Sequence, residues 1–313
     1  MECLHPIVVK STDGLSNYRL VPCGKCIACR ARKASSWSLR VQNEASDSNS
    51  CYFITLTYTD DNLTYGDSLN ATLVPSDLSG FIKRYRKYLT SHYDDKHSVR
   101  FFAAGEYGDR FGRPHYHLML FYPFQISTED VRKGVQACWH YNDPLLQPID
   151  VQDFSVPLAN YITKYCLKQI GFDYEGVCPP FARMSRRPGI GANHYSVAIR
   201  EVIRSSGQHF LYDAQQHRIS MPRYYRPFFY SDDEQSAYSY SIERKLFISE
   251  DTSVKMRGLR YFSDVISSHM MYEYNYFRDF RCDGFKRVSP DISVSRSVGH
   301  RYISSYIEPD GSF

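Results

Sequence analysis

The chain has 313 residues, enough for one large domain or two modest ones, and 42% of them are hydrophobic, so a core can form. Its net charge of +4 is compatible with nucleic acid and is only weak evidence for it. The sequence does not begin with a basic stretch followed by an apolar one, and no apolar run approaches the roughly 20 residues of a membrane helix, so neither a signal peptide nor a membrane span is predicted.

Hydrophobic periodicity predicts alternating strands and helices up to residue 170. Strands are expected where β-branched and aromatic residues cluster, and helices where apolar residues recur at helical spacing. The order predicts an α+β fold, a split βαβ arrangement with an antiparallel sheet and helices on one face. The predicted elements are a helix at 35–45, a strand at 51–58, a helix at 75–89, strands at 99–108 and 112–122, a helix at 127–140, a strand at 147–154 and a helix at 156–170.

Changes in composition divide the chain into three parts. A Cys-rich N-terminal element at 1–50 is expected to pack on a core at 51–175, and the C-terminal region at 176–313 is expected to bind DNA or serve an accessory role. Within that region, 177–195 is rich in Pro, Gly and Arg and is expected to form an ordered loop. A hairpin is predicted at 209–227, and 232–280 is expected to be mainly helical.

Two histidines stand one residue apart in the stretch GRPHYHLML. Residues two apart on a strand share a face, so His115 and His117 point the same way. Glu106 ends the preceding strand, and the intervening turn brings it back beside the histidines. Two imidazoles and a carboxylate leave open positions on a divalent metal, as a catalytic site requires. The alternative is a solvated sheet face with two unrelated histidines.

Two tyrosines, Tyr161 and Tyr165, lie four residues apart in YITKYCLK and share one face of the predicted helix. Each is followed three residues later by a lysine, Lys164 and Lys168. A lysine at that position can activate the phenol, hold a phosphate or orient a metal-bound water. Tyrosines with the same spacing occur in YEYNY without the lysines, so the tandem Tyr-x-x-Lys pattern distinguishes this segment.

With FITLTY, RPHYHLML and YITKYCLK in that order, the chain resembles the HUH endonucleases, the rolling-circle replication initiators. The tandem tyrosines are similar to those of the subgroup from microviruses, bacteriophages with small single-stranded DNA genomes. The flanking stretches PCGKCIACR and MSRRPGIGANHY resemble the gokushovirus branch of that group. The core motifs cover roughly 51–170, and the resemblance implies an HUH, RRM-like fold there.

The resemblance also implies a chemistry. Glu106, His115 and His117 would hold Mg²⁺ or Mn²⁺, which polarises the scissile phosphate. Tyr161 or Tyr165 would attack phosphorus, leaving a 5′-phosphotyrosine link and a free 3′-OH that primes synthesis. The second tyrosine would cut the regenerated origin while the first is loaded, and the released strand would be joined into a circle.

The implied partners are single-stranded DNA at a phage origin and the helicase and DNA polymerase of the host, in the bacterial cytoplasm. Exchange of a phosphodiester for a phosphotyrosine ester conserves bond energy, so joining needs no ATP. Accordingly the sequence has no G-x-x-x-x-G-K-[ST] motif, and unwinding would fall to a separate helicase.

A cysteine cluster lies near the N-terminus, where Cys23, Cys26 and Cys29 form C-x-x-C-x-x-C. This spacing suits a thiolate metal site, and Cys3, or less readily His5, can supply a fourth ligand to a structural zinc. The alternative is free thiols, because nine cysteines, an odd number without a secretory signal, indicate a reducing cytoplasm. An iron–sulfur cluster also fits the spacing but is not expected from the resemblance.

Two basic stretches supply candidate DNA contacts, since cations interleaved with glycine or aromatic residues can follow a phosphate backbone. For the first stretch a solvated charged face is the alternative, whereas the glycine and proline of the second favour a defined loop that contacts DNA. The candidates are Arg30, Arg32 and Lys33 after the cysteines, and Arg183, Arg186 and Arg187 in RMSRRPG.

Three other classes of protein share part of this pattern. A relaxase or transposase uses the same HUH chemistry, but relaxases usually carry a third histidine and an N-terminal tyrosine. A β-barrel oxygenase also uses His-x-His and Glu, but its glutamate normally follows the histidines. A single-stranded DNA-binding zinc protein without nuclease activity is the non-enzymatic alternative, and the tyrosine helix would then serve packing alone.

Overall fold

The computed structural model describes most of the chain between residues 18 and 238. One compact unit comprises residues 1–108 and 113–237, and a second unit, residues 109–112 and 238–313, lies almost wholly outside the described part. The helical region predicted at 232–280 therefore falls outside it beyond residue 238, and the division at residues 50 and 175 stays a prediction. The described residues are 3, 7–10, 18–93, 99–108, 112–143, 145, 148–164 and 175–238.

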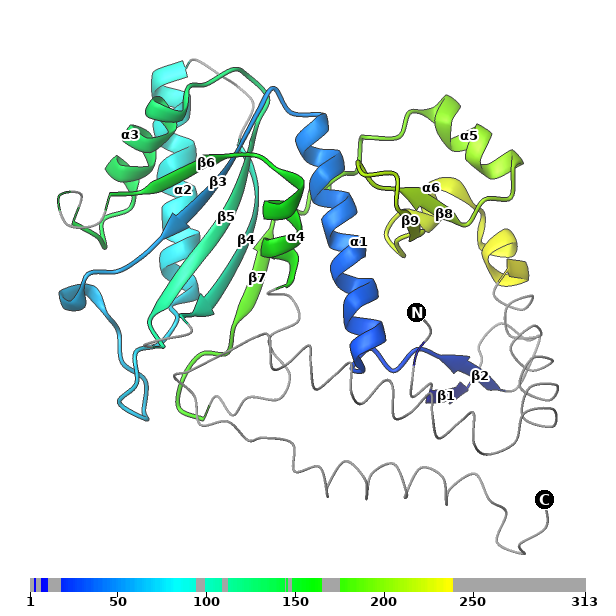
Figure 1. Ribbon diagram of the computed structural model, residues 1–313, viewed down its shortest axis with the longest axis horizontal. Coiled ribbons are helices and arrows are strands. Elements are labelled where there is room, and N and C mark those ends of the chain that lie inside the picture. Colours follow the sequence, from blue (N-terminus) through cyan, green and yellow to red (C-terminus); the bar gives the residue numbers. More distant parts are fainter. Residues whose placement is uncertain are drawn as a thin grey trace, which may run out of the picture. The chain divides into compact units, whose positions relative to one another are not determined.

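A five-stranded sheet forms the centre of the first unit, with its strands in the order β6-β3-β5-β4-β7 (Figure 1). Every pair of neighbouring strands is antiparallel. This confirms the α+β class and the antiparallel sheet. The strands are β3 (Ser50–Leu56), β4 (Arg100–Tyr107), β5 (Pro114–Tyr122), β6 (Asp150–Asp153) and β7 (Phe181–Met184).

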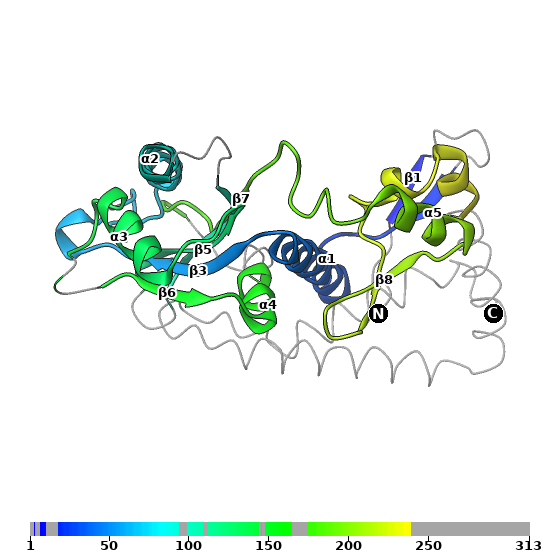
Figure 2. The same cartoon turned by 90° about the horizontal axis from the view of Figure 1, so that it is seen from above.

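Helices cover both faces of this sheet, and Figure 2 shows α2 and α4 on opposite sides of it. On the first face, the hydroxyl of Tyr85 in α2 lies 2.8 Å from that of Tyr122 in β5. On the second face, α1 and α4 pack against the sheet around Met119 of β5. The helices associated with the sheet are α1 (Ile27–Ser46), η1 (Asp60–Asn62), α2 (Pro75–Tyr93), α3 (Thr128–Cys138) and α4 (Val156–Lys164).

The prediction of helices on one face only is therefore wrong. Its physical cause is visible in β5, where HLMLFY is apolar at successive positions rather than at alternate ones, and both faces of the strand are buried. A strand that is apolar on both sides must be covered on both sides, because either bare face would leave large side chains in water. The helix α1, which precedes the first strand of the sheet, supplies part of the second layer.

The N-terminal part adds a two-stranded antiparallel sheet, β1 (Ile7–Lys10) with β2 (Tyr18–Val21), ahead of α1. The helix α1 begins at Ile27, well before the predicted start at residue 35. Its additional turns read IACRARKA, and Ala, Arg and Lys are among the best helix formers. The cysteine spacing in this stretch drew the interpretation away from a helix.

Beyond the sheet, a smaller cluster follows the segment predicted as an ordered loop. That segment contains β7, a four-residue edge strand too short to show a strand period, and then continues as a loop. The predicted hairpin is confirmed as β8 paired with β9. Leu39 of α1 packs into the core of this cluster. Its elements are α5 (Val197–Ser205), β8 (Phe210–Tyr212), β9 (Arg218–Ser220) and α6 (Arg226–Phe229).

None of the described helices combines the length and the apolar character needed to cross a bilayer.

Gly191 lies where the loop after β7 passes closest to α1. Its φ of +70° is a left-handed conformation, and an added Cβ would lie 2.5 Å from the hydroxyl of Tyr225 and 2.7 Å from the carbonyl oxygen of Arg40. We expect Gly191→Ala to lower the free energy of unfolding by about 2–4 kcal/mol, measured by urea unfolding. Gly207→Ala is the matched control, because Gly207 has a φ of +63° with no atom within 4 Å. Equal losses in the two variants would contradict the close approach.

Candidate metal and nucleophile site

The register of β4 and β5 brings a carboxylate and two imidazoles together. Glu106 is paired directly with His115, and His117 lies two residues further along the same face of β5. The Nε2 atoms of His115 and His117 both lie 2.9 Å from Oε1 of Glu106. Glu106 and His117 are buried, and His115 is partly exposed. The structure thus assembles the three residues that the sequence analysis selected.

The outer nitrogen of each imidazole also has a partner. Nδ1 of His115 donates to the carbonyl oxygen of Arg113 at 3.1 Å, and Nδ1 of His117 lies 3.1 Å from Oγ1 of Thr55. A neutral imidazole that donates through Nδ1 has only a lone pair at Nε2. Nε2 of His115 then faces a carboxylate oxygen, and two acceptors at 2.9 Å need a positive charge between them.

A proton or a metal ion can supply that positive charge. The candidate ligand atoms of Glu106, His115 and His117 all lie within 4.8 Å of one another. Two imidazole nitrogens and one carboxylate oxygen suit a divalent transition metal, and a three-ligand set leaves positions for water or a phosphate oxygen. Metal-binding histidines typically use the second ring nitrogen as His115 does here, on a backbone carbonyl. The donor set therefore fits a catalytic metal.

The helix α4 places a tyrosine next to this group. Ala159 and Ile162 on its inner side are buried in the sheet core, which fixes the rotation of the helix. The Tyr161 ring lies 5.3 Å from that of His117 and 6.1 Å from that of Phe53, measured between centroids. Tyr161 nevertheless stays 40% exposed, so the phenol is accessible to a large substrate.

Of the other residues predicted on this helix, Lys164 ends α4 and is exposed. Tyr165 and Lys168 lie outside the described residues. Their predicted roles beside Tyr161 stay predictions from the sequence.

A second group of candidate ligands lies where α1 begins. The sulfur atoms of Cys3, Cys23, Cys26 and Cys29 all lie within 4.8 Å of one another. The structure thus assigns Cys3 as the fourth member, while His5 lies outside the described residues. Four converging thiols that are half-buried or buried have the composition of a closed structural zinc site.

Backbone amides favour a thiolate in this group. Burial raises the pKa of the Cys23 thiol, but the N–H groups of Cys26 and Lys25, which donate to Cys23 Sγ at 3.3 and 3.4 Å, together with the neighbouring thiols outweigh it. The pKa of Cys23 falls from 9.0 to about 7. Burial, and next the thiols of Cys3 and Cys26, raise the pKa of Cys29 to about 12. A bound cation would be needed to make all four sulfurs thiolates at neutral pH.

The predicted DNA contacts differ in what their side chains do. Arg183 lies in β7 and turns inward, where its Nη1 donates to the carbonyl oxygen of Pro75 at 2.9 Å and to Ser79 Oγ of α2. Arg186 and Arg187 are exposed in the following loop. On α1, Arg32 and Lys33 are exposed, and Nε of Arg30 donates to the Lys25 carbonyl oxygen at 2.6 Å.

Sequence reasoning missed two residues that orient the histidines, Thr55 and Arg113. Thr55 faces His117 because the two are paired in the β3–β5 register. The alternation within FITLTY gives a signal for Thr55, since it places a polar side chain on the face of Phe53. Arg113 acts through its backbone carbonyl, for which side-chain patterns carry no signal. Its guanidinium donates to the Tyr58 carbonyl oxygen at 2.8 Å and pairs with Asp60.

Comparison with known proteins identifies this arrangement of sheet and site residues. Residues 51–170 match the family of the replication-associated protein ORF2. The replication-associated protein ORF2 of Spiroplasma virus 4 is 28% identical over 218 residues, which span 66% of this chain and 66% of that protein. The replication-associated protein VP4 of Bdellovibrio phage phiMH2K is 27% identical over 288 residues, which span 82% of this chain and 86% of that protein.

A solved structure, the hypothetical protein ORF119 from Sulfolobus islandicus rod-shaped virus 1, matches with 22% identity and a TM-score of 0.27, covering 43% of this chain and 97% of that chain. The family and sequence matches confirm the predicted resemblance. The region 51–170 is of the ORF2 replication-associated type. The chain belongs to the replication-associated proteins of microviruses.

Thr55 offers a test of how the metal candidate is organised. Replacing its hydroxyl in Thr55→Val leaves Nδ1 of His117 without a partner, and the loss of such an outer contact typically lowers metal affinity about 10- to 100-fold. We expect Mn²⁺ to bind at least about tenfold more weakly, measured by electron paramagnetic resonance of free Mn²⁺. Thr55→Ser keeps the hydroxyl and should bind as the wild type does. Unchanged affinity in the valine variant would show that Thr55 does not orient His117.

Proposed function

We propose that this protein initiates rolling-circle replication of a phage genome by nicking and joining single-stranded DNA at the origin. The observation that carries the proposal is the position of Tyr161, whose ring lies against His117 of the Glu106–His115–His117 group. A nucleophile and a metal-binding group at one place suit attack on a phosphodiester. The replication-associated relatives support the same biological role.

The reaction follows from the groups that this site brings together. The Tyr161 phenol oxygen attacks phosphorus and loses its proton, the bond from phosphorus to the 3′ oxygen breaks, and that oxygen takes up a proton as a 3′-OH. The 5′ end stays on the tyrosine as a phosphodiester. Mg²⁺ or Mn²⁺ held by Glu106, His115 and His117 would polarise the phosphate. Lys164, which ends the same helix, and the predicted Lys168 would stabilise the added negative charge.

Joining is the same exchange in reverse, with the 3′-OH attacking the phosphotyrosine. Because one phosphodiester replaces another at each step, bond energy is conserved and ATP is not needed. Tyr165 would act as the second nucleophile, cutting the regenerated origin while Tyr161 is loaded. Mapping the covalent adduct identifies which of the two attacks first.

The proposed partners follow from this reaction. Single-stranded DNA at the phage origin is the substrate, and the host supplies the helicase and the DNA polymerase in its cytoplasm. Neither a membrane nor a nucleotide cofactor takes part. A relaxase or transposase would use the same site, and the replication-associated relatives favour the initiator. The non-enzymatic alternative, a DNA-binding zinc protein, predicts no covalent product.

The covalent intermediate is the decisive test. The wild type, mixed with a pool of single-stranded DNA that includes the phage origin and with Mn²⁺, should give an SDS-resistant adduct on YITKYCLK that EDTA prevents. Single Tyr161→Phe and Tyr165→Phe variants should retain cleavage, and the double variant should lose it. Tyr212→Phe, which alters a tyrosine of β8 that is 51% exposed, is the control. Normal cutting by the double variant would refute the assigned nucleophiles.

His117→Ala should abolish the adduct while the thermal unfolding midpoint shows that the chain stays folded. A His117→Ala variant that still forms the adduct would separate the metal group from the reaction.

We further propose that Cys3, Cys23, Cys26 and Cys29 bind Zn²⁺ as a structural site. Cys26→Ser should reduce the zinc content from one ion per chain to a small fraction of that, measured by plasma mass spectrometry, and should lower the unfolding temperature because metal affinity contributes to folding. Cys178→Ser, which removes a thiol far along the sequence from this group, should keep full zinc content. Iron in place of zinc, or no metal in the wild type, would contradict the proposal.

A further inference from the structure

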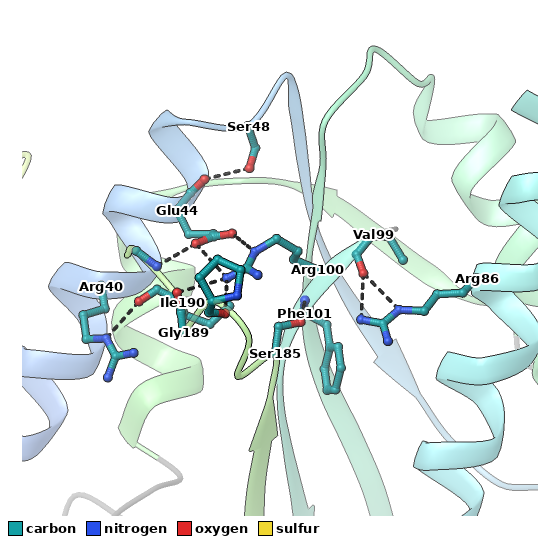
Figure 3. Close-up of polar contacts among 12 residues, drawn as sticks. Arg40, Glu44, Ser48, Arg86, Val99, Arg100, Phe101, Ser185, Gly189 and Ile190 are labelled. Carbon is teal, nitrogen blue, oxygen red and sulfur yellow. Dashed lines mark hydrogen bonds and ion pairs between the residues drawn. The ribbon is translucent and has the colours of Figure 1, made fainter. Parts of the chain in front are cut away.

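The loop that follows β7, residues 185–191, is fixed through its backbone. Nη2 of Arg100 donates to the carbonyl oxygens of Pro188 and Gly189 at 2.9 and 3.0 Å, and Nε of Arg40 donates to that of Ile190 at 2.9 Å (Figure 3). Three successive carbonyls therefore point at arginines of the protein body. Such a loop has one conformation, because each alternative would leave these groups unpaired.

A buried carboxylate on α1 holds this arrangement together. Glu44 pairs with Nε of Arg100, and its Oε2 accepts the backbone N–H of Gly191 at 2.6 Å (Figure 3). Glu44 is 9% exposed, so its charge depends on these partners. The Arg100 guanidinium thus joins Glu44 to the loop carbonyls, and the single negative charge of Glu44 is neutralised within the body of the protein.

Further contacts lock both ends of the loop. At its start, the amide of Ser185 donates to the Phe101 carbonyl oxygen at 2.9 Å, and the amide of Phe101 donates to Ser185 Oγ at 3.1 Å. At its end, the Tyr225 hydroxyl donates to the Gly191 carbonyl oxygen at 2.8 Å. The Arg40 guanidinium lies over the Tyr224 ring, 3.7 Å from its centroid.

With its backbone facing inward, the loop presents its charged side chains to solvent. Arg186 and Arg187 are exposed, and neither side chain has a hydrogen-bond or ion-pair partner in the part of the chain that the structure describes. Gly189 packs against Tyr224, and the residue before Tyr224 is a third exposed arginine, Arg223. A rigid surface with three guanidinium groups results.

This surface is separate from the Glu106–His115–His117 group. The loop is tied to Arg100, which begins β4, whereas Glu106 lies six residues further along the same strand. At about 3.3 Å per residue the two ends are about 20 Å apart. A ligand that contacts both must be long, and the repeating phosphates of DNA meet that requirement.

We propose that Arg186, Arg187 and Arg223 bind the phosphate backbone of DNA outside the nicking site, and that Glu44 is a positioning residue for this surface. The inference rests on the proposed function for the identity of the polymer. Guanidinium groups match phosphate geometry with paired hydrogen bonds. A loop fixed before binding loses little conformational entropy on contact, which favours affinity without reading the base sequence.

The test is DNA binding measured in EDTA, so that no cleavage is required. With a long fluorescent single strand of random sequence, Arg186→Ala/Arg187→Ala should weaken binding to all sequences alike. The slope of log K against log salt should become shallower by about 1.4, since each lost phosphate contact accounts for about 0.7 on single strands. Lys83→Ala/Lys87→Ala removes two exposed charges from α2 and should keep the wild-type slope. Equal slopes in the wild type and the arginine variant would overturn the proposal.

Glu44→Gln separates positioning from simple charge. The substitution removes a negative charge, so electrostatics alone predicts tighter DNA binding. The positioning role predicts weaker binding, together with faster amide exchange at Gly191. Glu129→Gln removes an exposed charge on α3 and should not weaken binding. Tighter binding by the Glu44 variant would refute its positioning role, and if this variant fails to fold, the arginine variants still decide the proposal.

Cleavage kinetics distinguish this surface from the nicking site. Because the surface is remote from the reacting phosphate, the arginine variant should raise KM for origin DNA and leave kcat unchanged. A lower kcat would place these arginines in the reaction instead. If the wild type forms no covalent adduct at all, the proposed function fails, and the salt slopes still test whether the loop binds DNA.

Discussion

A carboxylate buried against two imidazoles is the interaction on which the arrangement of this protein depends. Glu106 has little access to water, and its oxygen faces ring nitrogens at 2.9 Å. Burying that charge is unfavourable unless cations or donors surround it. The paired strands β4 and β5 supply the imidazoles in register, β3 supplies the hydroxyl behind one of them, and α4 closes the neighbouring face with Tyr161.

The metal candidate could be predicted from the sequence because it depends on short-range rules. The two-residue period of a strand puts His115 and His117 on one face, and a hairpin returns Glu106 to them. The helical period likewise brings Tyr161 to the surface of a helix whose other side is apolar. The elements between residues 51 and 164 were correct in type and order for the same reason, since each has a strong period of its own.

What could not be predicted depends on contacts distant in the sequence. The second helical layer follows from the burial of β5 on both faces, which shows that cover is needed and does not identify α1 as its source. The strand β7 is four residues long and exists through its pairing with β4. Arg183 belongs to a basic stretch that suggests DNA, yet its side chain binds α2, because only the fold places Pro75 and Ser79 within reach.

The helix α1 contributes to two cores at once. Val41 and Ala45 pack into the core beneath the sheet, while Leu39 packs into the cluster that contains Leu211 and Met221. Neither core is complete without this helix, so melting α1 would expose apolar surface in both. The sheet and the C-terminal cluster should therefore lose their structure in one cooperative transition rather than in two, and separating them by proteolysis or truncation would leave each with an open hydrophobic face prone to aggregation.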